Sequence, residues 1–258
     1  MSILDAVASV LLVHAHPDDE TIGTGGLIAE LASRGLRVSL VTATRGERGE
    51  VVEGPLSALQ GTAALAQERE RELGLACSVL GVTERFWLGE DPARAPGLSP
   101  RRYLDSGMEW IRPGLAGPAA DSDANALARA PLIDVTNDLV AVVQHVRPDL
   151  VISYDATGGY GHPDHVRVHE AVLAASSALT IRYAEILESP TADAEWLDCA
   201  GHRDTVVAAL RCHSSQLTVD NSDGDFIVHS GGQREAVHTG IGLRLSAPGT
   251  AEKSEHRE

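Results

Sequence analysis

The chain has 258 residues, of which 43% are hydrophobic and 22% are charged. These values are ordinary for a globular protein, and a chain of this length buries a sizeable core without disulfide bonds. They exclude disorder, collagen-like structure and coiled coil as the main architecture. The formal net charge of −16 repels phosphate backbones and anionic lipid, so we expect neither a nucleic acid nor a membrane as a partner.

Cysteine spacing and the N-terminal sequence indicate a cytoplasmic protein. Cys77, Cys199 and Cys212 lack the spacing of a metal or redox motif, and we interpret them as small buried residues in a reducing compartment. The sequence contains no run of about 18 apolar residues that would span a membrane. Residues 1–13 carry no basic region typical of a signal peptide. The sequence leaves open whether the chain forms a homo-oligomer.

The first half of the chain predicts alternating strands and helices. Nearly continuous apolar or β-branched runs predict strands over Val7–His14 and Arg37–Thr44, with a shorter strand over Gly81–Leu88. Helical spacing predicts helices over Leu27–Arg34 and Ala63–Leu80. A strand, a helix and a second strand in close succession form a βαβ unit, whose two strands pair in parallel.

The second half continues this alternation after a long irregular segment. Residues 91–131 hold six of the twelve prolines and predict an irregular insertion, a kind of segment that often carries function. The whole chain predicts one α/β domain over 1–248, with a Rossmann-like, mostly parallel sheet and helices on both faces, and a disordered tail over 249–258. Beyond the insertion we expect strands over Asp149–Tyr154 and Ile181–Glu188 and helices over Ile133–His145, Val166–Ala178 and Thr205–Cys212.

Two polar clusters follow predicted strands directly. HAHPDDE (14–20) comes at the end of the first strand, and YGHPDH (160–165) comes soon after the strand that ends at Tyr154. Ligands of open parallel sheets bind outside the carboxyl ends of the strands. If the two strands lie near one another, both clusters face the same crevice. This placement predicts a shared site.

The residue types in these clusters suit a catalytic metal ion. Such an ion takes three nitrogen or oxygen ligands from the protein and leaves one position for water. His16 and Asp19 are three residues apart across a proline turn and can converge on one point, and His165 can supply a third ligand. Asp18 and His162 would then lie beside the metal, where a carboxylate accepts a proton and a histidine polarises the reacting carbonyl. Zinc and ferrous iron both accept such ligands.

Other interpretations of these residues stay open at this point. A His–Pro turn followed by acids also caps a helix, with Asp18 or Asp19 as the N-cap residue. Gly23–Gly26 suggests phosphate binding at a helix N-terminus but lacks GxGxxG spacing, so we expect it to allow tight packing instead. Ser214 and Ser215 lie near a histidine, but the surroundings of a nucleophile elbow are missing.

The same motifs resemble a known family. A strand followed by AHPDDE (15–20), with GGYGHPDH (158–165) much further along, looks like the LmbE/PIG-L family of metal-dependent de-N-acetylases, and the likeness runs over most of Val7–Ala175. LDSGM (104–108) and the stretch YDATGGYGHPDH (154–165) are similar to its actinobacterial mycothiol branch. RCHSSQ (211–216) resembles the C-terminal His–x–Ser–Gln element of the family.

The resemblance implies a role for each matching residue. Zinc ligation falls to His16, Asp19 and His165. Asp18 would be the general base that then passes the proton to the leaving amine, and His162 would stabilise the oxyanion. Asp164 would tune His162, and Tyr160 would be a mobile side chain over the carbonyl. Arg69 and Asp105 would bind the sugar, and Arg71 is an alternative to Arg69 in that role.

The implied function is zinc-dependent hydrolysis of the N-acetyl amide on an N-acetylglucosamine-type sugar such as N-acetylglucosaminyl-inositol. The products would be acetate and the free amine, and the partner a small N-acetylated sugar. Within the same family, the alternatives are a thiol-conjugate amidase and a deacetylase that tailors a natural-product sugar. The alternatives from other functional classes are a hydrolase of an ester or phosphoester and a non-catalytic sugar- or nucleotide-binding module.

Overall fold

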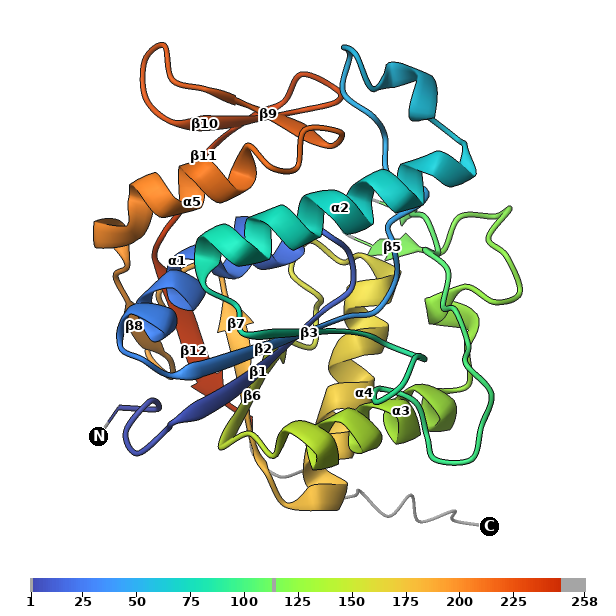
Figure 1. Ribbon diagram of the computed structural model, residues 1–258, viewed down its shortest axis with the longest axis vertical. Helices are drawn as coiled ribbons and strands as arrows, with labels where there is room; N and C mark the ends of the chain where they lie inside the picture. Colours follow the sequence, from blue (N-terminus) through green and yellow to red (C-terminus); the bar gives the residue numbers. More distant parts are fainter. Residues whose placement is uncertain (1, 113–114, 247–258) are drawn as a thin grey trace.

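A seven-stranded sheet forms the centre of the computed structural model, which describes residues 2–112 and 115–246 (Figure 1). Its strands lie in the order β3-β2-β1-β6-β7-β12-β8. The first five strands of that order pair in parallel, whereas β12 is antiparallel to both of its neighbours. The bounds are β1 Ser9–His14, β2 Arg37–Thr42, β3 Glu84–Trp87, β6 Leu150–Tyr154, β7 Arg182–Leu187, β8 Glu195–Leu197 and β12 Ile241–Leu245.

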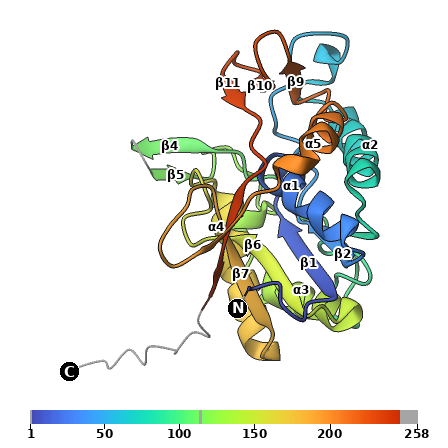
Figure 2. The same ribbon diagram turned by 90° about the vertical axis from the view of Figure 1, so that its left-hand side faces the viewer.

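Helices cover both faces of this sheet (Figures 1 and 2). One face carries α1 Asp19–Ser33, α2 Ala63–Leu80 and α5 Arg203–Leu210. The other face carries α3 Leu132–Val146 and α4 Pro163–Leu179. The predicted fold class is therefore confirmed as an α/β structure with a mostly parallel sheet between two helical layers.

Strand β1 is buried on both faces because side chains alternate along a strand. Val10 and Leu12 belong to the apolar core that includes α1 and α2, and Leu11 and Val13 belong to the core that includes α3 and α4. All four side chains have no exposed surface. This explains the nearly continuous apolar sequence of the strand.

The starts of two helices were predicted wrongly. Helix α1 begins at Asp19 rather than at Leu27, so the acidic motif starts the helix and Gly23–Gly26 lies inside it. Helix α4 begins at Pro163, within the second polar cluster, rather than at Val166. In both helices the first turn is polar, and the apolar spacing that predicted the helix begins only later.

The chain beyond α5 forms strands that the sequence pattern did not predict. Strands β9 Leu217–Asp220, β10 Phe226–His229 and β11 Arg234–Ala236 form a small antiparallel sheet, drawn at the top of Figure 1. This sheet packs on α5 through a small apolar cluster. The strands are short and mostly half-exposed, so their alternation is too weak to recognise from the sequence.

Residues 91–112 and 115–131 lie between β3 and α3 and largely lack regular structure. They contain the antiparallel pair of β4 Glu109–Arg112 and β5 Leu115–Gly117, which extends away from the main sheet in Figure 2. The predicted single domain over 1–248 stays a prediction, and the tail predicted over 249–258 lies outside the described residues. Single 3-10 turns span Ser57–Leu59, Leu127–Arg129 and Ala200–His202.

The cysteines and the helices can be compared with what the sequence predicted about thiols and membrane spans. Cys77 and Cys199 are buried, Cys212 is partly exposed, and all three are free thiols. Within residues 2–112 and 115–246, every helix is too short or too polar to cross a lipid bilayer.

The strand order reverses at β1. The chain runs from β1 outward to β2 and β3 on one side, and later returns to place β6 and β7 on the other side. Such a reversal leaves a crevice at the carboxyl ends of the two central strands, which is where open α/β sheets bind ligands. His14 ends β1 and Tyr154 ends β6, so both polar clusters begin at this crevice.

Helix α1 packs so closely on its neighbours that one of its glycines leaves no room for a side chain. A Cβ atom on Gly26 would lie 2.6 Å from the carbonyl oxygen of Thr239 and 3.1 Å from the Cβ atom of Cys199. The close approach of this backbone supports the packing role that we expected for the glycine-rich segment.

We predict that Gly26→Ala lowers the free energy of unfolding by about 1–3 kcal/mol, because two backbone segments must move apart. Gly23 is the matched control in the same helix, since a Cβ atom there meets nothing within 4 Å. Gly23→Ala should raise stability by about 0.8–1.0 kcal/mol through helix propensity. Urea unfolding measures both variants, and equal stabilities would contradict the packing argument.

Candidate metal centre

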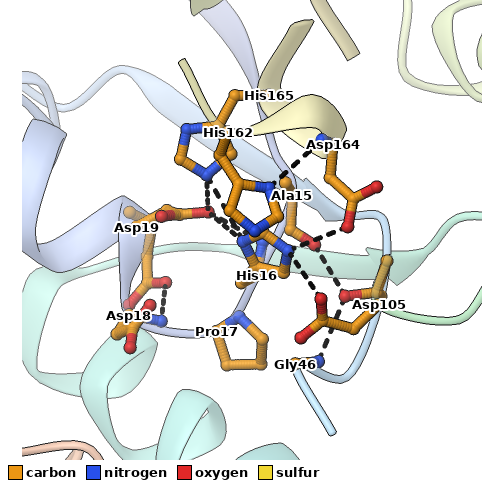
Figure 3. A network of polar contacts seen from close by, with 12 residues as sticks. Ala15, His16, Pro17, Asp18, Asp19, Gly46, Asp105, His162, Asp164 and His165 are labelled. Carbon is orange, nitrogen blue, oxygen red and sulfur yellow. Dashed lines mark hydrogen bonds and ion pairs between the residues drawn. The ribbon is translucent and has the colours of Figure 1, made fainter. Parts of the chain in front are cut away.

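The two polar clusters meet at the ends of strands β1 and β6. Leu12 pairs with Ile152 in parallel register, and the loops that follow the two strands lead into α1 and α4. One group of possible ligand atoms within 4.8 Å of one another comes from His16, His162 and His165. A second such group comes from His16, Asp105, His162 and Asp164. His16 therefore stands at the centre of a buried cluster of imidazoles and carboxylates (Figure 3).

Three atoms in this cluster form a nearly equilateral triangle. Nδ1 of His16 lies 3.3 Å from Oδ2 of Asp19. Nε2 of His165 lies 3.3 Å from the same carboxylate oxygen and 3.3 Å from Nδ1 of His16. A single ion between them would contact all three atoms at once. The structure thus brings together the three residues that we expected to bind a metal.

Hydrogen bonds on the far side of each imidazole leave the inward nitrogen free to bind an ion. Nε2 of His16 lies 3.2 Å from Oδ2 of Asp164 and 3.7 Å from Oδ1 of Asp105. Nδ1 of His165 lies 3.2 Å from the carbonyl oxygen of Gly158. An imidazole that binds a metal is neutral and carries one proton, and these acceptors draw that proton to the outer nitrogen. Nδ1 of His16 and Nε2 of His165 then keep their lone pairs.

The carboxylate of Asp19 is oriented by two donors. Its Oδ2 atom accepts hydrogen bonds from the backbone N–H of His16 at 2.8 Å and from the hydroxyl of Tyr154 at 2.7 Å. Burial acts to raise the pKa of Asp19, but the charges and hydrogen bonds of His165 and His16 outweigh it and hold the pKa well below its usual range. The side chain is therefore a carboxylate.

Tyr154 was not recognised as a site residue from the sequence. Its ring stacks on His165 with centroids 4.1 Å apart and planes 7° from parallel. Its hydroxyl accepts a hydrogen bond from the backbone N–H of Ala15 and donates one to Asp19. The one signal in the sequence was its place as the last residue of a buried strand.

Asp164 contacts His16 with its side chain and His162 with its backbone. Its fully buried carboxylate accepts hydrogen bonds from Nε2 of His16, from both the N–H and the hydroxyl of Ser106, and from the N–H of Ala128. Burial acts to raise the pKa of Asp164, but the His16 hydrogen bond and charge outweigh it and lower the pKa. The predicted tuning of His162 by Asp164 stays a prediction. The hydrogen bond from the Asp164 N–H to Nδ1 of His162 is a direct contact between the two residues.

His162 is a neutral imidazole with its proton on Nε2. Its Nδ1 atom accepts a hydrogen bond of 3.2 Å from the backbone N–H of Asp164, which places the ring proton on the other nitrogen. Burial lowers the pKa of His162 to about 4, and its electrostatic interaction with the neighbouring His16 acts in the same direction. The side chain can therefore donate a hydrogen bond near pH 7 without being charged.

Asp18 occupies the N-cap position of α1 without using its side chain as a cap. Within the described residues, its carboxylate makes no hydrogen bond to the helix backbone; Oδ2 instead lies 2.9 Å from the guanidinium of Arg69. Burial raises the pKa of Asp18 to about 6, although Arg69 acts against this. The backbone has φ 103° and ψ −33°, a conformation that costs about 1–3 kcal/mol in a residue other than glycine. The alternative in which this motif only caps a helix is therefore disfavoured.

The other predicted residues surround this cluster at different depths. Arg69 is buried, and its guanidinium donates to the carbonyl oxygens of Gly46 and Pro17 as well as to Asp18. Arg71 lies on the exposed face of α2 and pairs with Glu68, so of the two arginines Arg69 is the one at the site. The sugar-binding role of Arg69 stays a prediction.

Asp105 and Tyr160 lie next to different histidines of the cluster, His16 and His165 respectively. Asp105 is buried, and its carboxylate accepts hydrogen bonds from the backbone N–H groups of Arg48 and Gly107. The Tyr160 ring is 56% exposed and lies 5.2 Å from the His165 ring. Their predicted roles, in sugar binding and over the carbonyl, stay predictions.

A cavity of about 750 Å³ opens beside the cluster. Asp18, Asp19, Tyr160 and His165 are among its lining residues. The lining also includes residues at and after the end of β7 and in the β10–β11 hairpin, namely Ile186, Leu187, Glu188, Ser189, Thr191, His229 and Glu235. The cavity beside two of the candidate metal ligands is therefore lined in part by residues from the last third of the chain.

The family model for GlcNAc-PI de-N-acetylases, PIG-L, matches residues 11–176. The chain belongs to the PIG-L family. The resemblance inferred from the two polar clusters is therefore confirmed, and both clusters fall within the matched span. In this PIG-L protein, the cavity-lining residues within 186–191, together with His229 and Glu235, lie beyond that span.

Relatives of this PIG-L protein carry the name 1D-myo-inositol 2-acetamido-2-deoxy-alpha-D-glucopyranoside deacetylase. The one from Kineococcus radiotolerans is 47% identical over 172 residues, which are 67% of this chain and 45% of that protein. The one from Actinosynnema mirum is 36% identical over 273 residues, covering 92% of this chain and 89% of that protein. The chain thus matches less than half the length of the first and most of the second.

A solved structure shows the same fold. The N,N'-diacetylchitobiose deacetylase from Pyrococcus horikoshii is similar with a TM-score of 0.56 at 22% identity, over 81% of this chain and 71% of that one. The arrangement of sheet and helices described above is therefore shared with this solved structure.

We predict that Tyr154→Phe weakens the binding of a divalent metal about 10- to 100-fold, because Asp19 loses a donor that orients it. A competition titration against a chromophoric chelator measures the change. Tyr183→Phe is the matched control, since that buried hydroxyl bonds the Tyr154 carbonyl instead of Asp19. A comparable loss in both variants would show that the Tyr154 hydroxyl does not act through Asp19.

Proposed function

We propose that this PIG-L family member is a metal-dependent N-deacetylase. It hydrolyses the acetamide of an N-acetylglucosamine-type sugar, such as N-acetylglucosaminyl-inositol, and releases acetate and the free amine. The observation that carries the proposal is the triangle of 3.3 Å between His16, Asp19 and His165, with Asp18 on the cavity wall beside it. The names of the family and of its relatives support the sugar substrate.

The spacing of the three donor atoms fits zinc. Zinc bonds to nitrogen and oxygen are about 2.0–2.2 Å long and are arranged as a tetrahedron in protein sites. A regular tetrahedron with bonds of about 2.0–2.1 Å has edges of about 3.3–3.4 Å, which matches the observed 3.3 Å. Two imidazoles and one carboxylate also suit ferrous iron, so the donor set favours zinc and admits Fe²⁺.

The side chains around this set supply the proton transfers. When bound, the ion would act as a Lewis acid toward the acetyl carbonyl and the attacking water. Asp18 accepts the proton of that water and passes it to the leaving amine, as a general base and then a general acid. Neutral His162 donates its Nε2–H to the oxygen on which negative charge develops, a contribution of about 10²–10³ in rate.

The remaining side chains orient these groups and receive the sugar. Asp164 holds His16 through its carboxylate and His162 through its N–H, so it fixes the direction of both rings. Asp105 and Arg69 bind sugar hydroxyls at the inner side of the site. Tyr160 lies over the acetyl carbonyl, between Gly159 and Gly161, which both have positive φ and place it at the cavity.

Asp18→Ala should keep its metal and lose turnover about 10²–10⁴-fold, because the variant lacks the base but retains every proposed ligand. His165→Ala should lose the metal itself. Metal analysis of the purified variants, together with acetate release, separates the two effects. A variant at position 18 that loses metal while the one at position 165 retains it would contradict the assigned roles.

A screen of substrates tests the proposed reaction. We expect acetate release from N-acetylglucosaminyl-inositol with a kcat/KM at least about tenfold above that for a bulky thiol conjugate, a difference of about 1.4 kcal/mol in transition-state binding. A preference for the conjugate would indicate an amidase instead, and preference for a natural-product sugar a tailoring deacetylase. Phosphate release would indicate a phosphoesterase. A protein that binds no zinc would be the non-catalytic module.

A further inference from the structure

The strained backbone of Asp18 is held at each of its polar groups. Its N–H donates a hydrogen bond of 3.0 Å to Oε2 of Glu20, and its carbonyl oxygen accepts from the N–H groups of Thr21 and Ile22 at 2.9 Å each. Its carboxylate is bonded to Arg69. Of these contacts, only those to the Glu20 and Arg69 side chains depend on residue type, so these two side chains select the conformation.

Glu20 is itself fixed by a residue from the C-terminal part of the chain. Its carboxylate is completely buried, and Oε1 lies 2.9 Å from Nε2 of His213 and within hydrogen-bond distance of the Thr21 hydroxyl. With Oε1 held in this way, Oε2 remains for the N–H of Asp18. His213 is also completely buried and lies beyond the span matched by the family model.

A second buried carboxylate anchors the same segment from a different helix. Glu72 of α2 accepts hydrogen bonds from the hydroxyl of Ser214 at 2.9 Å, and from the N–H and hydroxyl of Ser215 at 2.7 and 2.6 Å. The RCHSSQ segment is therefore attached to α1 through His213 and to α2 through the two serines. Only the first attachment reaches Asp18 through side chains in direct contact, since Glu20 contacts both His213 and the N–H of Asp18.

We propose that His213 and Glu20 are positioning residues, which together hold the Asp18 backbone at positive φ and keep its carboxylate on the cavity wall. Without the pair, the N–H of Asp18 loses its acceptor, and the residue can relax to the ordinary N-cap conformation with negative φ. That rotation would turn the carboxylate toward the first turn of α1, where an N-cap aspartate normally bonds. The proposal rests on the proposed function, because it concerns Asp18 as the base.

The contacts favour positioning over a purely stabilising role. A buried ion pair contributes little net stability, because removing both charges from water costs about as much as their attraction gains. Glu20 accepts from the backbone N–H of the N-cap residue, as the glutamate of a capping box does, although it is the second residue of the helix rather than the third. Here that N-cap residue is Asp18, the proposed base, and its φ is positive. The contacts of the pair therefore fix the backbone conformation of Asp18.

Steady-state acetate release by metal-loaded variants tests the proposal. In Glu20→Gln and His213→Leu, we expect kcat to fall about 10- to 100-fold while KM stays within about twofold and metal content is unchanged, since only proton transfer is misaligned. His213→Gln retains an N–H that can reach Oε1 of Glu20, so it should recover at least about tenfold of the kcat lost in His213→Leu.

Glu72→Gln is the matched control, because it weakens the other attachment of the same segment. It should lower the free energy of unfolding, because Ser214 and Ser215 lose a charged acceptor, but leave kcat within about threefold of the wild type. If Glu72→Gln lowers kcat as far as His213→Leu does, the segment acts only on stability and the proposal is wrong. A rise in KM without a fall in kcat would also overturn it.

A crystal structure of each variant separates this proposal from the proposed function. If the wild type releases no acetate from any sugar, the proposed function fails. The positioning proposal is then tested by the φ angle of Asp18 alone. We expect Asp18 to keep positive φ in the wild type and in Glu72→Gln, and to change to negative φ in His213→Leu. An unchanged Asp18 in His213→Leu would overturn the proposal whatever the activity.

Discussion

The parallel pairing of β1 with β6 is the constraint on which the candidate site depends. These strands are far apart in the sequence, but their hydrogen-bonded register fixes where each one ends, and the two polar clusters start at those ends. A slip of one residue would turn His14 and Tyr154 to the opposite faces of the sheet. Close packing on both faces opposes this slip, because Val10 and Leu12 fill the core that includes α1, and Leu11 and Val13 fill the core that includes α4. The core thus determines the distance between His16 and His165.

Around this pair, polar contacts set the direction of each functional atom. Acceptors outside the imidazoles choose the tautomers, a tyrosine hydroxyl and a backbone N–H orient the Asp19 carboxylate, and Ser106 holds Asp164. These contacts come from several distant parts of the chain. They show why residues 104–106, within the irregular segment, belong to the site although they are remote from the main sheet in sequence.

The sequence allowed the fold class and the central cluster to be predicted, because both depend on patterns that are local. Long apolar runs gave the strands of the sheet, and His–Pro–Asp motifs at strand ends indicated a common crevice. Contacts between distant segments could not be derived in this way. Tyr154 looked like an ordinary strand residue, and the attachment of His213 to Glu20 needs the position of α5. The helix starts at Asp19 and Pro163 were missed because polar first turns hide the helical spacing.

Two separate parts of the chain line the cavity. One part of its lining lies at the ends of the parallel strands β1 and β6 and in the loops after them, and the other part lies at the end of β7 and in the β10–β11 hairpin. His16, Asp19 and His165 all belong to the first part of the fold. A change of length or sequence in that hairpin would therefore reshape the cavity while the three donor atoms keep their spacing.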